Sequence, residues 1–463
     1  MKNLLRTILL ICVFILQSVS IAQPLQLDMN VFAERRKEFA KRIDSSAAAI
    51  FAAKPEYIRN GDVTYDYRQE SNFFYLSGFD EPQSILLINP SHPKYKFVMF
   101  VRKRDLRRET FDGPRAGVEG AMSTFKADTA IYFDDFEKSL FQFMRRDRTL
   151  YYTFGINPEI DTKIQQFFSG KNSPLIDPSS ILSEMRLIKN DGDWKLGMQQ
   201  SIDISVKAHL EAYKVVRPGM NEAEIQAVFE SAYRKYGSMR NGYPCIVGSG
   251  PNATILHYNK NTRVMNDGEL LLMDCAAEYG GYSADITRTV PVNRKFSKRQ
   301  REIYELVLAA QNAAMSMIKP GLRYNEWNMA IDSVLGNGLA KLGFIKDKKD
   351  FRVFSLHGYG HWIGQEVHDV GAYSMNGESR KLEPGMVFTI EPGLYVRPIV
   401  FDALKERGYD DNDISKIRAV VEPYMNIGVR IEDDILVTKD GYKNLSAGVP
   451  RELDAIEKYM KSR

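Results

Sequence analysis

Residues 270–289 read LLLMDCAAEYGGYSADITRT and place two aspartates on either side of a turn. Asp274 ends an apolar run typical of a buried strand, Gly280-Gly281 marks the turn, and Asp285 lies on the returning strand. A hairpin of this spacing would bring the two carboxylates face to face. Because a buried, unpaired carboxylate is costly, these aspartates need a cation or strong hydrogen bonds.

The second half of the chain repeats this pattern. The segment MVFTIEPG, residues 386–393, ends an apolar run at Glu391, and VRIEDD, residues 429–434, does much the same at Glu432. Any one of these acids taken alone would be interpreted as a strand-end salt-bridge or capping residue. Four acids on or just after apolar strands instead favour a shared metal site.

Three of the six histidines fall in one glycine-punctuated segment, HGYGHWIGQEVHD, residues 357–369. On a helix, His357 and His361 would share a face as in a zinc metalloprotease, but the glycines disfavour a helix and the expected glutamate is absent. An extended segment would instead direct the imidazoles into a common cavity. Together with the acids, this ligand set suits two divalent ions such as manganese better than a single zinc ion. For His92 and His209 we expect structural roles.

Residues 190–450 contain an internal repeat of helix, Pro-Gly break and helix, followed by strands. The first break is Pro218-Gly219, with Asn221 and Glu224 at capping-box spacing, and the second is Pro320-Gly321. We therefore expect two related halves packed around a shared site.

Length and composition are those of an ordinary multidomain globular protein, with 463 residues, 44% hydrophobic and 26% charged, and a net charge of +4. This small charge, and a basic cluster at 102–108 without interleaved aromatic residues, argue against nucleic-acid binding. Residues 29–180 indicate a mixed α/β unit with a helix over 29–53 and strands at 84–88 and 96–101. We expect the join to the second unit at 183–194.

The first 22 residues have the pattern of a secretory signal peptide. Lys2 and Arg6 precede the apolar residues 8–16, and Ala22 stands at a suitable cleavage position. This run is too short to span a bilayer, where about 20 residues are needed. We therefore expect a secreted or periplasmic protein, cut after Ala22, without stable membrane insertion; an uncleaved anchor is the alternative. Cys245 and Cys275 are expected to be buried free thiols.

These motifs, in this order, resemble the aminopeptidase P/prolidase group of dinuclear metallopeptidases. The resemblance rests on Asp274, GYSADITRT at 281–289, HGYGH at 357–361, EPG at 391–393 and RIEDD at 430–434, and in the first unit on NGDVTYDYRQESNFFYLSGF at 60–79 and ETFDGPRAG at 109–117. It implies an α/β fold, with an N-terminal mixed α/β domain at 29–180. A catalytic domain of the pita-bread fold would follow at 190–450, its pseudo-twofold halves surrounding a curved antiparallel sheet.

The resemblance also implies roles for particular residues. The implied metal ligands are Asp274, Asp285, His361, Glu391 and Glu432, with Asp285 and Glu432 bridging both ions. The ions would lower the pKa of a shared water and give a hydroxide that attacks the scissile carbonyl. His368 would steady the developing oxyanion, and Glu391 or a neighbouring acid is a candidate proton shuttle. The other implied site residues are His257 at the amide nitrogen of the bond being cut, His357, Tyr395 and Arg430 around the proline ring, and Asp62 near the substrate N-terminus, for which a turn-forming role is the alternative.

The implied function is the release of the N-terminal residue from peptides whose second residue is proline. A prolidase, which cleaves only Xaa-Pro dipeptides, is the alternative; the short segment 370–385, with Arg380 as its only arginine, favours the aminopeptidase. A non-catalytic peptide-binding relative is disfavoured because all five ligands are present.

The family resemblance further implies a homodimer or homotetramer. Two features depart from the family pattern. Phe111 stands where many relatives have a tryptophan that approaches a neighbouring subunit's site, and residues 401–424 form an additional, charged and helical piece that we expect at the rim of the site.

Overall fold

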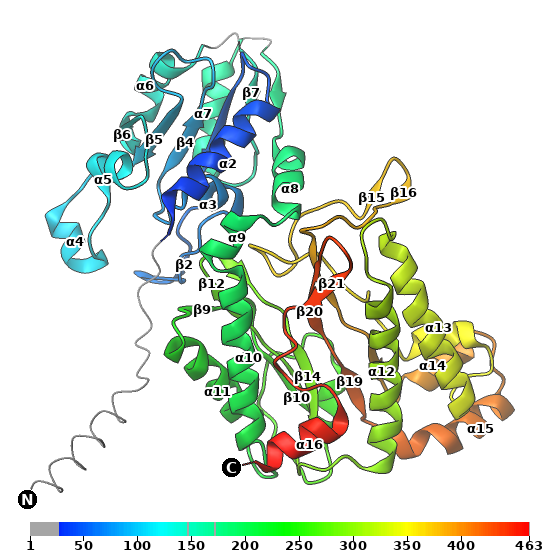
Figure 1. The fold of residues 1–463 in the computed structure, drawn as a ribbon. Coiled ribbons are helices and arrows are strands. Elements are labelled where there is room, and N and C mark those ends of the chain that lie inside the picture. Colours follow the sequence, from blue (N-terminus) through cyan, green and yellow to red (C-terminus); the bar gives the residue numbers. More distant parts are fainter. Residues whose placement is uncertain (1–26, 146–147, 171–172, 463) are drawn as a thin grey trace, which may run out of the picture.

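The computed structural model describes residues 27–145, 148–170 and 173–462, which form the two units visible in Figure 1. The predicted signal peptide, residues 1–22, lies outside these ranges. Within them, no helix combines the length and the apolar character needed to cross a membrane.

The N-terminal unit is a mixed six-stranded sheet with helices on both faces. In sheet order the strands are β6 (Thr129–Tyr132), β5 (Phe97–Val101), β4 (Ile85–Ile88), β1 (Ala48–Ala52), β7 (Leu150–Tyr151) and β8 (Leu175–Ile176). One face packs against α2 (Met29–Arg42), α3 (Ser71–Ser77), α5 (Gly117–Ser123) and α8 (Ser179–Leu187), and the other against α6 (Phe136–Phe143) and α7 (Pro158–Phe168). Alternate side chains of the central strands therefore enter two separate cores.

The helix predicted over 29–53 is wrong beyond Arg42, because the chain turns there and enters β1. Asp44 makes this turn, since its carboxylate accepts from the backbone N–H of Ser46 at 2.7 Å. Residues 48–52 are buried on both faces of the sheet, so their continuous apolar run could not be distinguished from a helix by periodicity. The predicted strands at 84–88 and 96–101 are present as β4 and β5.

Two further elements of the N-terminal unit lie outside the six-stranded sheet. They are the hairpin of β2 (Ile58–Asn60) and β3 (Val63–Thr64), and α4 (Leu106–Asp112), which buries none of its residues. Figure 1 shows α4 projecting away from the sheet. The region predicted as the join, 183–194, consists of the end of α8 and the start of α9 (Asp191–Leu196).

The C-terminal unit contains the predicted helix pairs. They are α10 (Met198–Val215) with α11 (Glu222–Lys235), and α12 (Lys298–Met317) with α13 (Tyr324–Leu342). Asn221 and Glu224 form the predicted capping box at the start of α11. Cys245 and Cys275 are buried and free, as predicted.

Each helix pair is followed by short antiparallel strands. The first half contributes β9 (Arg240–Asn241), β10 (Ile246–Ser249), β11 (Leu270–Asp274), β12 (Ala277–Tyr279), β13 (Tyr282–Ser283) and β14 (Thr287–Pro291). The second contributes β15 (Ser374–Met375), β16 (Glu378–Ser379), β17 (Val387–Ile390), β18 (Gly393–Tyr395), β19 (Gly428–Arg430), β20 (Asp433–Val437) and β21 (Tyr442–Asn444). One continuous apolar core joins both halves.

Strand register brings the acid-bearing ends of the two halves together. Asp274 at the end of β11 lies opposite Thr287 of β14, and Ile390 of β17 lies opposite Asp433 of β20. The halves are bonded directly, since the backbone N–H of Glu432 donates to the carbonyl of Thr287 at 3.1 Å. The four predicted acids therefore converge at the seam between the halves.

The additional piece at 401–424 is helical, as predicted. It comprises α14 (Val400–Glu406), α15 (Asp411–Val421) and a 3-10 turn, Glu422–Tyr424, and the chain ends with α16 (Leu453–Lys461). Figure 1 shows α14 and α15 on the outer side of the second half, where α14 contacts the 3-10 helix Lys348–Val353 that follows α13.

Candidate metal centre and peptide site

Three of the predicted ligands form a compact buried cluster. Donor atoms of Asp285, His361 and Glu432 all lie within 4.8 Å of one another. Nε2 of His361 lies 3.3 Å from Oδ2 of Asp285 and 3.6 Å from Oε1 of Glu391, which brings the fourth ligand into the group. As predicted, the segment that carries His361 is extended rather than helical.

The fifth ligand, Asp274, is linked to this cluster by a residue that the sequence did not indicate. The hydroxyl of Tyr243 lies 2.6 Å from Oδ1 of Asp274 and 2.6 Å from Oδ1 of Asp285. Tyr243 lies in a short loop between β9 and β10, outside every motif. No local pattern could have identified it, because it reaches the carboxylates only in the folded chain.

Burial and mutual repulsion destabilise the anionic forms of these acids. Burial, reinforced by the neighbouring carboxylates Asp285 and Asp274, raises the pKa of Glu391 to about 7, although His361 and Arg430 oppose the shift. The same two causes raise the pKa of Glu432 well above its usual range. Burial alone would lower the pKa of His361, but Asp285 and Glu391 raise it to about 9. Buried acids of this density require positive charge, and their donor set fits divalent cations.

Neighbouring side chains fix the orientation of the ligands. The hydroxyl of Thr287 donates to Glu432 at 2.6 Å, and Asp434 accepts from the backbone N–H of Asp285 at 3.1 Å. Arg288 and Asp433 form an ion pair of 2.7 Å in which both side chains are completely buried, and Arg288 also donates to the carbonyl of Glu432. Thr287 could have been found from the sequence, because positions 285 and 287 share one face of an extended chain.

The predicted walls of the proline pocket form a hydrogen-bonded series. Nη1 of Arg430 donates to the hydroxyl of Tyr395 at 2.9 Å, and that hydroxyl lies 2.7 Å from Nε2 of His357. Nδ1 of His357 faces the carbonyl of Gly358 at 2.6 Å, so Nδ1 carries the proton and Nε2 accepts from Tyr395. Burial and the charge of Arg430 lower the pKa of His357 to about 3. The imidazole is therefore neutral at physiological pH.

The remaining predicted residues lie farther out. His368 is exposed, and its ring meets that of His361 edge-to-face at 4.2 Å between centroids. His257 occupies an exposed turn, close enough to lower the pKa of both His357 and His368. Asp62 lies at the exposed β2–β3 turn, and no hydrogen bond or ion pair within the described ranges joins it to the cluster. Its predicted role stays a prediction.

His209 and His92 have the structural roles expected of them. The ring of His209 is completely buried and its Nε2 lies 3.1 Å from the carbonyls of Cys275 and Ile286. His92 packs against Tyr95 at the surface of the N-terminal unit.

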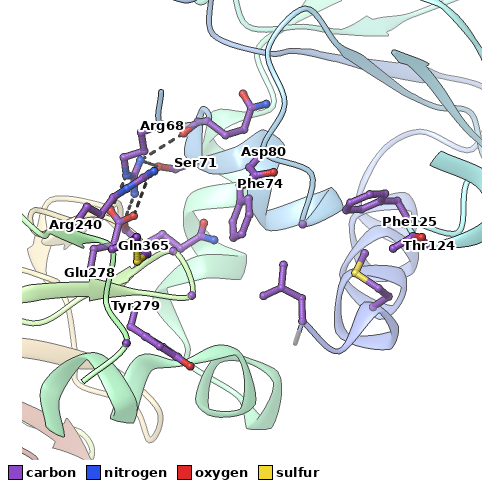
Figure 2. A pocket seen from close by; sticks show the side chains of 18 of the residues that line it. Arg68, Ser71, Phe74, Asp80, Thr124, Phe125, Arg240, Glu278, Tyr279 and Gln365 are labelled. Atoms are coloured by element: carbon purple, nitrogen blue, oxygen red, sulfur yellow. Dashed lines mark hydrogen bonds and ion pairs between the residues drawn. The ribbon is translucent and has the colours of Figure 1, made fainter. Parts of the chain in front are cut away.

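A cavity of about 1000 Å³ lies between the two units, and none of the predicted site residues lines it. Figure 2 shows its polar side, where Arg68 of the N-terminal unit reaches Glu278 and Gln365 of the C-terminal unit. Nε of Arg68 lies 2.6 Å from Glu278, and its Nη2 donates to the carbonyl of Gln365 at 2.5 Å. This cavity thus lies at the boundary between the two units, and through Gln365 it borders the histidine-bearing segment 357–369.

Comparison with known proteins agrees with this architecture. Residues 197–439 match metallopeptidase family M24, and residues 32–157 match the aminopeptidase P N-terminal domain. The chain is 38% identical to the Xaa-Pro aminopeptidase of Haemophilus influenzae, over 96% of this chain and 100% of that protein, and 35% identical to the Xaa-Pro aminopeptidase of Escherichia coli strain K12, over 94% and 98%.

Solved structures give the same result. The aminopeptidase PepP of Pseudomonas aeruginosa superposes with a TM-score of 0.86 at 38% identity, covering 94% of this chain and 98% of that one. A zinc-substituted E. coli aminopeptidase P in complex with product gives 0.85 at 35% identity, with the same coverage.

The chain therefore belongs to metallopeptidase family M24, with the aminopeptidase P type of N-terminal domain and the pita-bread catalytic fold that the sequence predicted. Within that family it is a metal-dependent Xaa-Pro aminopeptidase, a hydrolase, which confirms the predicted enzyme class.

Proposed function

We propose that this enzyme is an exported aminopeptidase that removes the N-terminal residue from peptides with proline at position two, using two divalent ions, with Mn²⁺ the first candidate. The observation that supports the two-ion site is the buried convergence of Asp285, His361 and Glu432, with Glu391 and Asp274 beside them. Oxygen ligands outnumber nitrogen in this set, and such sets suit manganese.

Each proposed role follows from where the side chain lies. Asp274, Asp285, His361, Glu391 and Glu432 would hold the ions, which when bound would supply Lewis acidity and make a water acidic enough to lose a proton and serve as the nucleophile. Glu391 lies within the cluster, 3.6 Å from Nε2 of His361, so its carboxylate is the candidate to take a proton from the attacking water and pass it to the leaving amine. His368 and His257 stand at the exposed side, where His368 would donate to the developing oxyanion.

The series formed by Arg430, Tyr395 and His357 would shape the pocket for the proline ring. An Xaa-Pro bond has no N–H, so the enzyme cannot position it through a backbone donor and must recognise the ring itself. The three residues are held against one another by bonds of 2.7 and 2.9 Å, which makes the wall rigid.

The prolidase alternative is disfavoured because the side chain of Arg380 is already engaged by a carboxylate. A dipeptidase needs a basic group free to capture the substrate carboxylate, and Arg380 is the only arginine in the segment 370–385. Its two terminal nitrogens already bind Glu184 at 2.7 and 2.8 Å.

Export and self-association belong to the same proposal. Export is supported by Lys2, Arg6 and the apolar run at 8–16, and N-terminal sequencing of protein recovered from its host should begin at Gln23. Self-association into a dimer or tetramer is supported by α4, where Phe111 is 82% exposed; light scattering of the purified protein would test it.

The activity is tested with purified protein loaded with Mn²⁺ or, separately, Zn²⁺. We expect mass spectrometry to detect release of Xaa from an Xaa-Pro-Yaa tripeptide, higher activity with Mn²⁺, and none after chelation. Cleavage of an Xaa-Pro dipeptide alone would make the enzyme a prolidase. Asp285→Asn serves as the matched inactive control.

A further inference from the structure

We infer that Arg186 and Lys189, at the link between the two domains, are positioning residues for His368, which they act on through the carboxylate of Asp369. This inference rests on the role proposed above for His368. Under this inference, the N-terminal domain and the link support catalysis by holding the loop of His368 in position, and not only by contacting the substrate.

The position of the His368 imidazole is not set by its own polar contacts. No hydrogen bond joins it to another residue in the part of the chain that the structure describes, and its ring meets that of His361 edge-to-face at 4.2 Å between centroids. An exposed side chain without such bonds takes its position from its backbone. The backbone is fixed by the next residue, Asp369.

Asp369 is anchored by two buried cations, Arg186 and Lys189. Its side chain is 1% exposed, Oδ1 binds Nη2 of Arg186, and Oδ2 lies 3.0 Å from Nζ of Lys189, whose side chain is also 1% exposed. The backbone N–H of Asp369 donates to the carbonyl of Trp362 at 2.8 Å, which closes the segment back to the residue after His361. His368 is thus held at a fixed distance from the metal-ligand histidine.

The ion pair of Asp369 and Lys189 packs tightly against Gly364. A Cβ atom added at Gly364 would lie 2.1 Å from Oδ2 of Asp369 and 2.7 Å from Nζ of Lys189. The carboxylate and the ammonium therefore occupy the space that any larger residue at position 364 would need. Burial would raise the pKa of Asp369, but Arg186 and Lys189 lower it below its usual value, so the carboxylate stays charged.

The two cationic side chains, Arg186 and Lys189, lie in the stretch 183–194 that joins the two domains. The N-terminal domain holds Arg186 in place. Nη1 of Arg186 donates to Oδ1 of Asn72 in α3 at 2.8 Å, and the backbone N–H of Lys189 donates to the carbonyl of Gly385 at 2.8 Å. Arg68 adds a second contact from the N-terminal domain to the same loop, through the carbonyl of Gln365 (Figure 2). Both domains thus fix the loop between His361 and His368.

The test uses the full-length enzyme with Lys189→Met, which removes one cation and leaves the Arg186 pair, so that the protein can still fold. The matched control is Glu184→Gln, which breaks another ion pair between α8 and the catalytic domain without touching the loop of His368. Thermal unfolding and metal content are measured for each variant, to separate positioning from loss of structure or of metal.

We expect Lys189→Met to lower kcat by about tenfold to a hundredfold with KM changed far less, because a displacement of about 1 Å has costs of that order. Lys189→Arg should recover part of kcat, and Glu184→Gln should keep it. In the His368→Ala background, Lys189→Met should cause almost no further loss, since residues acting through one another are not additive.

Multiplicative losses in the Lys189→Met/His368→Ala double variant would overturn the inference while leaving the proposed function intact. An unchanged kcat in Lys189→Met would do the same. If His368→Ala itself has normal kcat, the oxyanion role fails, and the positioning role falls with it. Absence of tripeptide cleavage by the wild-type enzyme would instead reject the proposed function.

Discussion

Nη2 of Arg430 donates to Oδ2 of Asp274 at 2.5 Å, so a wall of the predicted proline pocket is bonded directly to a predicted metal ligand. The other terminal nitrogen of Arg430 holds Tyr395, and its Nε lies 3.2 Å from the hydroxyl of Thr287, which in turn donates to Glu432. Substrate pocket and metal centre are therefore one connected unit. A substitution in the substrate pocket should therefore alter the metal centre, and a substitution in the metal centre should alter the pocket.

Arg430→Met tests this connection through stability. Without metal, the variant leaves Asp274 buried and unpaired, and we expect the free energy of unfolding to fall by about 3–5 kcal/mol. With Mn²⁺ bound, the ions compensate the same carboxylate, so the loss should be smaller. Urea unfolding in EDTA and in Mn²⁺ measures both values, and equal losses would contradict the connection.

Tyr243→Phe removes the hydroxyl that joins Asp274 to Asp285. We expect metal affinity to fall by about 10- to 100-fold with the fold retained, as for other residues that orient ligands. Metal titration against a competing chelator measures the affinity. Tyr236→Phe is the control, because its hydroxyl bonds Glu211 at 2.6 Å, away from the metal centre. Equal affinities in both variants would show that Tyr243 has no orienting role.

Asp285→Asn and Glu432→Gln test the proposed bridging ligands. Each substitution keeps the size of the side chain and removes the charge that two cations would share, so both variants should lose turnover and bind less metal. Tripeptide cleavage and elemental analysis measure the two effects. Full activity in either variant would remove that residue from the bridging position.

The sequence predicted that the acids gather at one site because Asp274, Glu391 and Glu432 end or follow apolar runs, where a carboxylate is conspicuous. Their role as metal ligands stays a prediction. It could not predict Tyr243, which comes from a short loop and meets Asp274 and Asp285 only through tertiary packing. Likewise, Arg186 and Lys189 fall in the stretch predicted only as the join between the two units, and only the folded chain shows them buried against Asp369.

The error at 43–53 has a different physical origin. A central strand covered on both faces is apolar at every position, and its period of two disappears. Only the turn at Asp44 separates it from the preceding helix, and a single Asx turn is a weak signal. This error did not affect the prediction of the overall fold, because the repeated Pro-Gly breaks and the paired acids on which that prediction rests lie elsewhere in the chain.

His209 should make stability depend on pH. Burial lowers its pKa to about 3, and its Nδ1 is buried without a hydrogen-bond partner in the described structure, so the folded protein does not accept the second ring proton. The unfolded chain accepts it below about pH 6.5. Stability is therefore complete above that pH and falls below it, by about 1.4 kcal/mol per pH unit until about pH 3.

The variant His209→Gln has no proton to bind, and it can still donate to a carbonyl. Compared with the wild type, its free energy of unfolding should vary less between pH 6.5 and 4, as measured by urea unfolding at each pH. Parallel curves for the two proteins over this range would mean that His209 contributes nothing to acid sensitivity.

Phe401→Ala tests whether the additional helices α14 and α15 act as a movable lid or as part of the core. Phe401 is 2% exposed and belongs, with Leu404 and Ile417, to the same apolar core as the two catalytic halves. Tyr409 also bonds Asp350 at 2.7 Å, and Arg418 lies 3.9 Å from the centroid of the Phe401 ring. We therefore expect a loss of about 3–5 kcal/mol in the free energy of unfolding, with kcat and KM of the folded enzyme nearly unchanged. A lid would give the opposite result, a clear change in KM with little loss of stability, because a segment that must open cannot hold its side chains in the core.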